Sequence, residues 1–229
     1  MGERDLSESP EQHQDIPAKL GVFPLRNSVV YPFMPQQLTA SRPQSIAVVE
    51  AAEADDNLVG IFAQKNPEDE EPVPEGMYGV GAIAKIHKVW RLPDGSVRLI
   101  VQGVRRAMMG KIVQAKPHLR AVLEPLEDHG EADAMAVQAM CRSVQQQFQS
   151  MVKMLPHLPD ELQIMVVNID HPGRLADFIA SNLDLQIEEH QRLLEALEIE
   201  ERLEYLTELL ARELEILELG NRIQTQVQE

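Results

Sequence analysis

Hydrophobic and polar residues alternate along much of the chain from residue 16 to residue 126, a pattern typical of β-strands. The clearest alternation runs from Val80 to Val101, where two arms flank the turn sequence Pro93-Asp94-Gly95. This arrangement predicts a β-hairpin. Further strands are predicted at residues 20–23, 57–64, 104–113 and 119–123. Roughly six short strands joined by tight turns favour a small closed or nearly closed β-barrel.

One helix and one long loop interrupt these strands. Residues 42–54 repeat hydrophobic positions at helical spacing, with Pro43 in the first turn and Ser41 as the expected cap. Residues 65–76 combine three prolines with five acidic residues and predict a solvent-exposed loop.

Beyond Pro125 the hydrophobic period lengthens to that of an α-helix. Helices are predicted at residues 131–155, 159–169, 170–182, 187–197 and about 199–227. The Glu–Arg spacings 188/192, 198/202 and 208/212 predict ion pairs within helices. The last helix carries a stripe of leucines at positions 203, 206, 210, 214 and 217. This stripe packs on the preceding helices or, given the length of the helix, part of the helix projects past them as a connector or a helical interface.

These elements predict an α+β fold with a small β-barrel and one helix at residues 16–126. A helical bundle ending in a long helix is expected at residues 127–229. Residues 1–15 contain almost no hydrophobic residues and are expected to form a disordered arm.

The amino-acid composition argues against several classes of function. Lys and Arg number 21 against 37 Asp and Glu, a formal charge of −16 at pH 7, so the chain repels phosphate backbones and is not expected to bind nucleic acid. No apolar run approaches the ~20 residues that a membrane span needs. The single Cys141 and the polar N-terminal stretch, which lacks a signal-peptide pattern, predict a soluble, cytoplasmic protein.

No pattern of catalytic, cofactor-binding or metal-binding residues is complete. Residues 79–84 match the dinucleotide motif G-x-G-x-x-A, but alternation past Ala84 predicts a strand where that motif requires the start of a helix. Gly110-Lys111 lacks the other residues of a P-loop, and the seven histidines are scattered. We expect this chain to have no enzymatic activity, no cofactor and no metal ion.

Large apolar residues cluster in segments that offer little strand length to bury them. They are either ordinary core or an adaptable exposed surface that accepts varied apolar segments of other proteins. The candidates for substrate binding are Tyr31, Phe33, Met34, Met77, Tyr78, Met108 and Met109.

Several motifs, taken in order, resemble the N-terminal domain of Lon proteases. The opening motif is Gly21-Val-Phe-Pro-Leu-Arg-Asn-Ser-Val-Val-Tyr-Pro32. It is followed by Ala63-Gln-Lys-Asn-Pro67, Tyr78-Gly-Val-Gly81, Leu92-Pro-Asp-Gly95 and Val101-Gln-Gly-Val-Arg-Arg-Ala107. The helical part adds Asp170-His-Pro-Gly-Arg-Leu-Ala-Asp177 and Leu194-Glu-Ala-Leu-Glu-Ile-Glu-Glu-Arg-Leu203.

The resemblance implies a PUA-like β-barrel and a helical bundle whose long helix leads toward an ATPase ring. Lon proteases are hexameric, ATP-dependent serine endopeptidases, and their ATP, magnesium and Ser–Lys dyad belong to modules that this sequence does not contain. The resemblance therefore assigns no catalytic residue here and implies recognition of unfolded, damaged or degron-bearing proteins. Two alternatives stay open: a structural module for oligomerisation and spacing, and a stand-alone Lon-domain adaptor.

Overall fold

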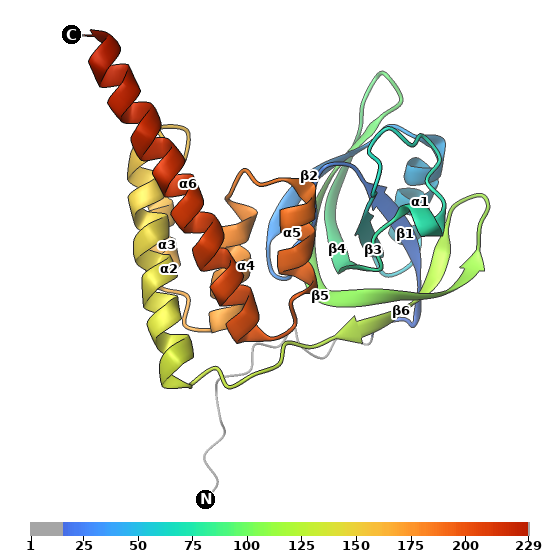
Figure 1. Ribbon diagram of the computed structural model, residues 1–229. Helices are drawn as coiled ribbons and strands as arrows, with labels where there is room; N and C mark the ends of the chain where they lie inside the picture. The colour runs from blue at the N-terminus through green and yellow to red at the C-terminus, as the bar shows by residue number, and fades with distance from the viewer. Residues whose placement is uncertain (1–15, 229) are drawn as a thin grey trace, which may run out of the picture.

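The computed structural model describes residues 16–228 and shows a β-barrel beside a bundle of helices (Figure 1). The strands are β1 (Lys19–Leu25), β2 (Pro35–Ala40), β3 (Leu58–Ala63), β4 (Val80–Arg91), β5 (Val97–Gln114) and β6 (Arg120–Leu126). Helix α1 (Pro43–Glu53) and the short 3-10 helix η2 (Pro74–Gly76) lie between them. The α+β fold predicted from the sequence is confirmed, while the arm predicted at residues 1–15 lies outside the described residues.

The six strands form one sheet in the order β2-β5-β4-β3-β1-β6, and a second pairing of β6 with β5 closes it into a barrel. The prediction of two strands at residues 97–101 and 104–113 was wrong, because β5 is a single strand of 18 residues. Residues 97–102 of β5 pair with β2, whereas residues 106–114 pair with β6 through two register shifts. This change of partner blurs the alternation that marks a strand in the sequence.

Both faces of the central strand β3 are buried, which explains its continuous hydrophobic sequence. Val59 and Ile61 pack in one cluster together with α1, and Leu58 and Phe62 pack in a second cluster on the opposite face. Successive side chains of a strand point to opposite faces, so one short strand serves two cores.

Helix α1 begins differently from the prediction. Its N-cap is Arg42 with no capping side chain, so the cap expected from Ser41 was wrong. The Arg42 guanidinium instead donates to Gln64 Oε1 at 2.7 Å and to the Pro24 carbonyl oxygen at 2.8 Å. Because Gln64 also donates to the carbonyl oxygen of Asp69 at 3.0 Å, this pair anchors the acidic loop to the barrel.

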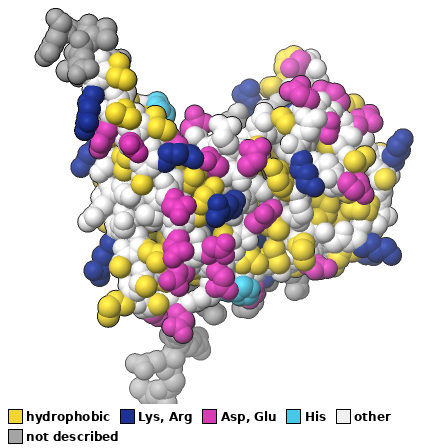
Figure 2. Space-filling view, viewed as in Figure 1, with side chains coloured by type: hydrophobic (Ala, Val, Ile, Leu, Met, Phe, Trp, Pro, Cys, Tyr) yellow, Lys and Arg dark blue, Asp and Glu magenta, His cyan; other side chains and the backbone are white. Residues whose placement is uncertain are grey.

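The helical part contains α2 (Met135–Met154), α3 (Glu161–Val167), α4 (Pro172–Ser181), α5 (Ile187–Glu195) and α6 (Ile199–Gln228), close to the predicted bounds. Helix α6 packs on α2 and α4 and then continues past them (Figure 1). Acidic side chains gather on the face that α6 presents in Figure 2. Of its leucine stripe, Leu203, Leu206 and Leu210 are fully buried, while Leu214 and Leu217 are partly buried.

None of the described helices is both long enough and apolar enough to cross a bilayer.

The hydrophobic core of the helical bundle continues into the barrel. Tyr31 and Ala63, from the barrel part, are buried in the same cluster as side chains of α2, α4, α5 and α6. The Tyr31 hydroxyl donates to the carbonyl oxygen of His190 at 3.0 Å, and Gln191 donates to the carbonyl oxygen of Val80 at 2.9 Å. Apolar packing and hydrogen bonds therefore fix α5 against the barrel.

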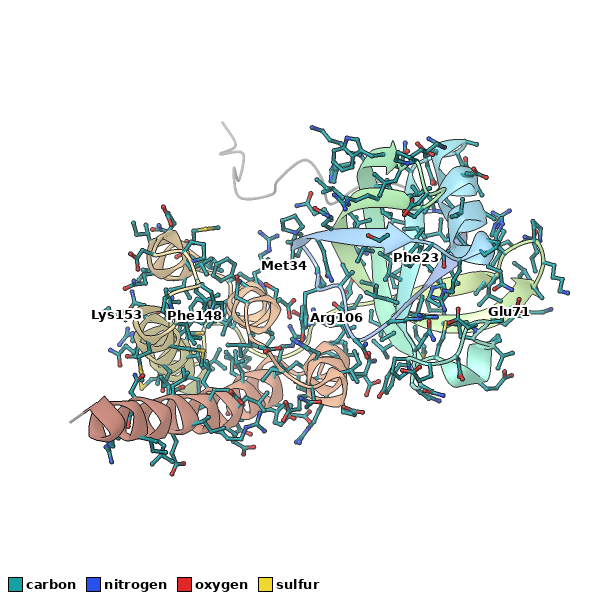
Figure 3. The ribbon with its side chains drawn as sticks, turned by 90° about the horizontal axis from the view of Figure 1, so that it is seen from above. Phe23, Met34, Glu71, Arg106, Phe148 and Lys153 are labelled. Atoms are coloured by element: carbon teal, nitrogen blue, oxygen red, sulfur yellow. The ribbon has the colours of Figure 1, made fainter. Side chains whose placement is uncertain are left out.

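A buried ion pair joins the two parts beside this core. Arg106 of β5 donates to the two carboxylate oxygens of Asp177 in α4, at 2.8 Å and 2.5 Å, and each side chain is only 3% exposed. Its Nε also donates to the carbonyl oxygen of Leu194 at 2.9 Å. Figure 3 shows Arg106 between the barrel and the helices.

A second arginine completes the network. Arg202 of α6 is fully buried and donates to both carboxylate oxygens of Asp128, at 2.5 Å and 3.0 Å, and to Asp177 at 3.4 Å. Burial opposes the ionisation of Asp128, but the hydrogen bond from Arg202 and the charge of Arg106 outweigh it and lower the pKa of Asp128. Two buried cations therefore face two carboxylates.

Replacing Asp177 by asparagine will leave Arg106 and Arg202 with an excess of buried positive charge. We expect the free energy of unfolding to fall by about 3 kcal/mol, measured by urea denaturation. The control Glu53→Gln removes a solvent-exposed ion pair with Arg91 and should change stability by less than about 1 kcal/mol. Equal losses in the two variants would contradict a special role of the buried network.

His190 is expected to make stability depend on pH, because burial lowers the pKa of its imidazole below the ordinary 6.5. As the pH falls, His190 therefore takes up its proton more readily in the unfolded chain than in the folded one. The stability that the neutral imidazole permits is complete above about pH 6.5 and declines below it. Urea midpoints measured from about pH 7.5 to about pH 5.5 test this. His190→Gln should flatten the slope in part, since burial also lowers the pKa of His118. An unchanged slope would contradict the assignment to His190.

Candidate functional site

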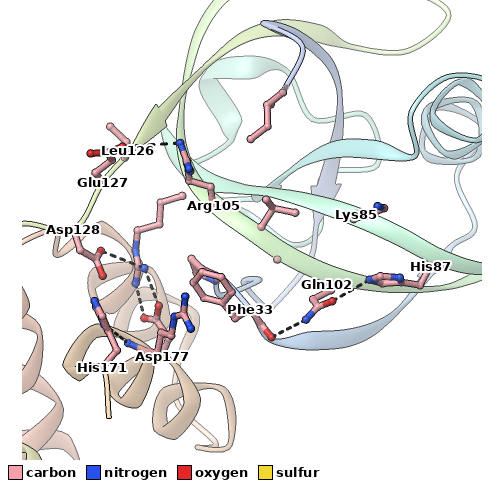
Figure 4. A pocket seen from close by; sticks show the side chains of 16 residues that line it. Phe33, Lys85, His87, Gln102, Arg105, Leu126, Glu127, Asp128, His171 and Asp177 are labelled. Carbon is pink, nitrogen blue, oxygen red and sulfur yellow. Dashed lines mark hydrogen bonds and ion pairs between the residues drawn. The ribbon is translucent and has the colours of Figure 1, made fainter. Parts of the chain in front are cut away.

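A cleft lies between the barrel and the beginning of α4, beside the Arg106 network (Figure 4). Its volume is about 590 Å³, within the range of pockets that bind small ligands. Residues from β4, β5 and α4 form its walls, together with the segments that precede β2 and follow β6. With Ile16, which precedes β1, the cleft is built from six separate stretches of the chain, and only the folded arrangement of both parts creates it.

Phe33 is the aromatic side chain of this cleft and has an unusual backbone. Its φ of 65° lies in the left-handed region, which bulky residues rarely adopt and which is enriched at functional sites. Two hydrogen bonds to Gly103 hold it there, from Phe33 N to the Gly103 carbonyl at 2.7 Å and from Gly103 N to the Met34 carbonyl at 3.1 Å. The side chain is 38% exposed, so the strained backbone presents an aromatic ring to solvent.

Polar neighbours fix the ring further. His87 Nε2 lies 3.0 Å from Gln102 Oε1, and the Gln102 amide donates to the Phe33 carbonyl oxygen at 3.2 Å. The guanidinium carbon of Arg174, in α4, lies 4.1 Å from the centroid of the Phe33 ring, a cation–π contact. Figure 4 shows Phe33 between the Asp177 cluster and the Gln102–His87 pair.

Most of the chain, including most of the cleft, matches the sequence pattern of a known protein family. The pattern described as the ATP-dependent protease La (LON) substrate-binding domain matches residues 19–212. The chain belongs to this Lon family.

Whole-chain relatives agree. The chain is 41% identical to the Lon protease of Dictyoglomus thermophilum over 227 residues, which is 99% of this chain and 28% of that protein. It is 36% identical to the Lon protease of Anaeromyxobacter dehalogenans over 214 residues, 93% of this chain and 25% of that protein. The chain thus spans about a quarter of the length of the curated relatives that it matches.

Solved structures show the same fold. The N-terminal domain of the Mycobacterium avium complex Lon protease superposes with a TM-score of 0.70 at 21% identity and covers 84% of this chain and 98% of that one. The Lon N-terminal domain protein from Xanthomonas campestris gives a TM-score of 0.58 at 17% identity, with 84% and 97% coverage.

The candidate residues predicted from the sequence do not form one surface in this Lon domain. Phe33 lies in the cleft and Met108 is 42% exposed on β5. The others pack against hydrophobic clusters: Tyr31, Met34 and Tyr78 against the core of the helical bundle, and Met77 and Met109 against the barrel core. Their role in binding stays a prediction.

Of the two interpretations left open by the sequence, ordinary core applies to Tyr31 and Met77, each of which is 2% exposed. Tyr31 is covered by α5, whose His190 is 159 positions away in sequence, so no local pattern could reveal the burial. Met77 follows η2 and fills the barrel core beside Phe62 and Ile83.

Sequence reasoning missed most of the cleft. Lys85, Gln102 and Arg174 line it, yet each reads as an ordinary polar position of a strand or helix. The sequence contained one useful signal for this site, in the segment from residue 170 to residue 177. There a histidine followed by a proline predicts the start of a helix. His171 indeed caps α4, with its Nδ1 accepting from Gly173 N at 3.2 Å.

The glycine-rich stretch at residues 79–84 and the single cysteine both lie in packed parts of the structure. No group of three or more His, Cys, Asp or Glu able to hold a metal ion occurs within residues 16–228. Gly81 of the G-x-G-x-x-A stretch lies in β4, where a Cβ would stand 2.2 Å from the Ile61 carbonyl oxygen. This glycine therefore permits close strand packing. Cys141 is buried, and burial raises the pKa of its thiol.

Gly103→Ala is expected to displace the backbone that presents Phe33. A Cβ at Gly103 would lie 2.1 Å from the Tyr31 carbonyl oxygen, so we expect a stability loss of about 2 kcal/mol by urea denaturation. Gly79→Ala is the matched control, because no atom lies within 4 Å of the position that its added methyl group would occupy. If both glycines tolerated alanine equally, Gly103 would not be holding this segment.

Proposed function

We propose that this chain is the non-catalytic, substrate-holding part of a Lon-type protease. It binds segments of unfolded, damaged or degron-bearing proteins, and ATPase and protease modules elsewhere in the full-length enzyme unfold and cleave them. ATP and magnesium act in those modules, so this chain needs no cofactor. Membership of the Lon substrate-binding family supports the proposal, as does the match to about a quarter of each full-length relative.

The observation that carries the proposal is the presentation of Phe33. Its backbone is held at a positive φ, which commonly disfavours folding by about 1–3 kcal/mol, and the ring faces an open cleft. A phenylalanine in an ordinary core would not require such a conformation. The strained backbone instead presents a rigid apolar contact to an incoming chain.

Contact with this ring selects for apolarity and not for a particular sequence. Burying a large apolar side chain against Phe33 contributes up to about 2–3 kcal/mol, which alone gives weak binding. That contribution depends little on salt, because it does not rest on charge. Weak and unselective binding suits a protein that must release each segment to the next module.

The free end of α6 supports a second function, assembly with other copies into the oligomer expected of Lon proteases. Ile216, Leu219 and Ile223 are each at least 50% exposed near this end of the helix. An apolar helix face without a partner in the described chain favours association with another helix. Sedimentation of the chain with and without Ile216→Ser and Leu219→Ser would measure it.

The binding of unfolded, reduced and alkylated casein tests the main proposal. Phe33→Asn removes the ring but keeps a residue that tolerates a positive φ, so we expect affinity to fall about tenfold in fluorescence anisotropy. Trp90→Ser is the control: Trp90 is 43% exposed, similar to Phe33, but lies outside the cleft. Unchanged affinity in the folded Phe33→Asn protein, or equal losses in both variants, would refute the role of the cleft.

A further inference from the structure

The rim of the cleft carries positive charge although the chain as a whole is strongly acidic. Four Lys or Arg residues line the cleft against three Asp or Glu residues, while the full chain has a net charge of −16. Resting on the proposed function, we propose that these cations select substrate segments in which a carboxylate lies beside a large apolar side chain.

The buried network leaves the other cations of the cleft free. Asp177 and Asp128 are satisfied by Arg106 and Arg202, so neither carboxylate is available to neutralise the rest of the rim. Lys85 and Arg174 have no carboxylate within ion-pair distance among the side chains that the structure describes. Arg105 pairs weakly with Glu127, because the two charged groups are 4.0 Å apart and Glu127 is exposed. Water and salt screen the attraction between such exposed charges.

Arg174 combines the apolar and the charged contact. Its guanidinium carbon lies 4.1 Å from the centroid of the Phe33 ring, so a positive charge lies directly beside the apolar contact surface. A cation–π contact does not use up the N–H donors of a guanidinium, so they can still donate to a carboxylate. An apolar side chain packed at Phe33 therefore brings the acidic group of a neighbouring residue within reach of Arg174.

The chemistry of the walls identifies a polypeptide carboxylate and disfavours a phosphate polymer. Apolar side chains of Ile16, Pro32, Val104 and Leu126 line the same cleft and offer nothing to a highly charged backbone. The net charge of −16 on the whole chain repels a polyanion strongly but a single small carboxylate only weakly. The carboxylate can be an Asp or Glu side chain or a chain terminus, and these two sources share the same chemistry.

Short fluorescein-labelled peptides with a Phe-Asp pair, a Phe-Asn pair, or Phe followed by a free or amidated C-terminus test the inference by fluorescence anisotropy. At low salt the Phe-Asp peptide should bind about fivefold more tightly than the Phe-Asn peptide. High salt should remove this preference while leaving the common apolar affinity in place. The free and amidated termini show whether a chain end is also accepted.

Substitutions in the cleft test which residues cause the preference for the Asp peptide. Lys85→Gln combined with Arg174→Gln should reduce the Asp-over-Asn preference to nearly one, and Lys85→Gln alone should halve it approximately. Lys88→Gln is the control, because Lys88 lies on the same strand but does not line the cleft. Circular dichroism confirms that each variant is folded before its affinity is interpreted.

The outcomes separate this inference from the proposed function. Equal binding of the Asp and Asn peptides, both weakened by Phe33→Asn, would overturn the charge selection and leave the apolar role intact. Binding of neither peptide, or no effect of Phe33→Asn, would overturn the proposed function itself. An Asp preference that Lys88→Gln lowers as much as Lys85→Gln does would also refute the inference, because general surface charge would then explain it.

Discussion

The buried pairing of two arginines with two aspartates decides how the halves of this protein fit together. Arg106 comes from the barrel, Asp177 and Arg202 come from helices, and Asp128 comes from the segment between. A buried charge without a partner is strongly unfavourable, so orientations that separate these groups are penalised. Fully satisfied polar networks in a low-dielectric interior favour one arrangement over nearby alternatives. The network therefore adds a directional constraint to the apolar packing that joins the two parts.

The cleft is a consequence of that geometry. One of its walls belongs to the barrel strands and the other to α4, and the ion network lies at the point where they meet. Arg174 lies three residues before Asp177 on α4, so the ion pair of Asp177 with Arg106 helps to hold the helical turn that brings Arg174 to Phe33. The positive φ of Phe33 is likewise held by hydrogen bonds to Gly103, close to Arg106 on the same strand. The same short stretch of β5 therefore contributes both to the stability of the fold and to the positioning of Phe33.

Local pattern predicted most elements of the fold and little of the site. Alternation located β4, a continuous hydrophobic run located β3, and helical periodicity located α2 and α6, because each signal depends on neighbours close in sequence. The spacing of Glu198 and Arg202 predicted an ion pair within α6, but Arg202 turns inward to Asp128 instead. Nothing in the spacing of residues shows that a charged side chain will be buried by an element far away in the chain. The site needed that information, since its walls come from both halves.

In the proposed function, a rigidly positioned site that makes weak contacts can serve many substrates. Because the structure holds Phe33 and Arg174 in place before any segment arrives, little of the binding free energy is lost in ordering the protein. The contact area of one aromatic ring and a few cations limits affinity to the weak range, whatever sequence is bound. In the proposed function, weak contacts at a preorganised small site therefore allow each bound segment to dissociate quickly.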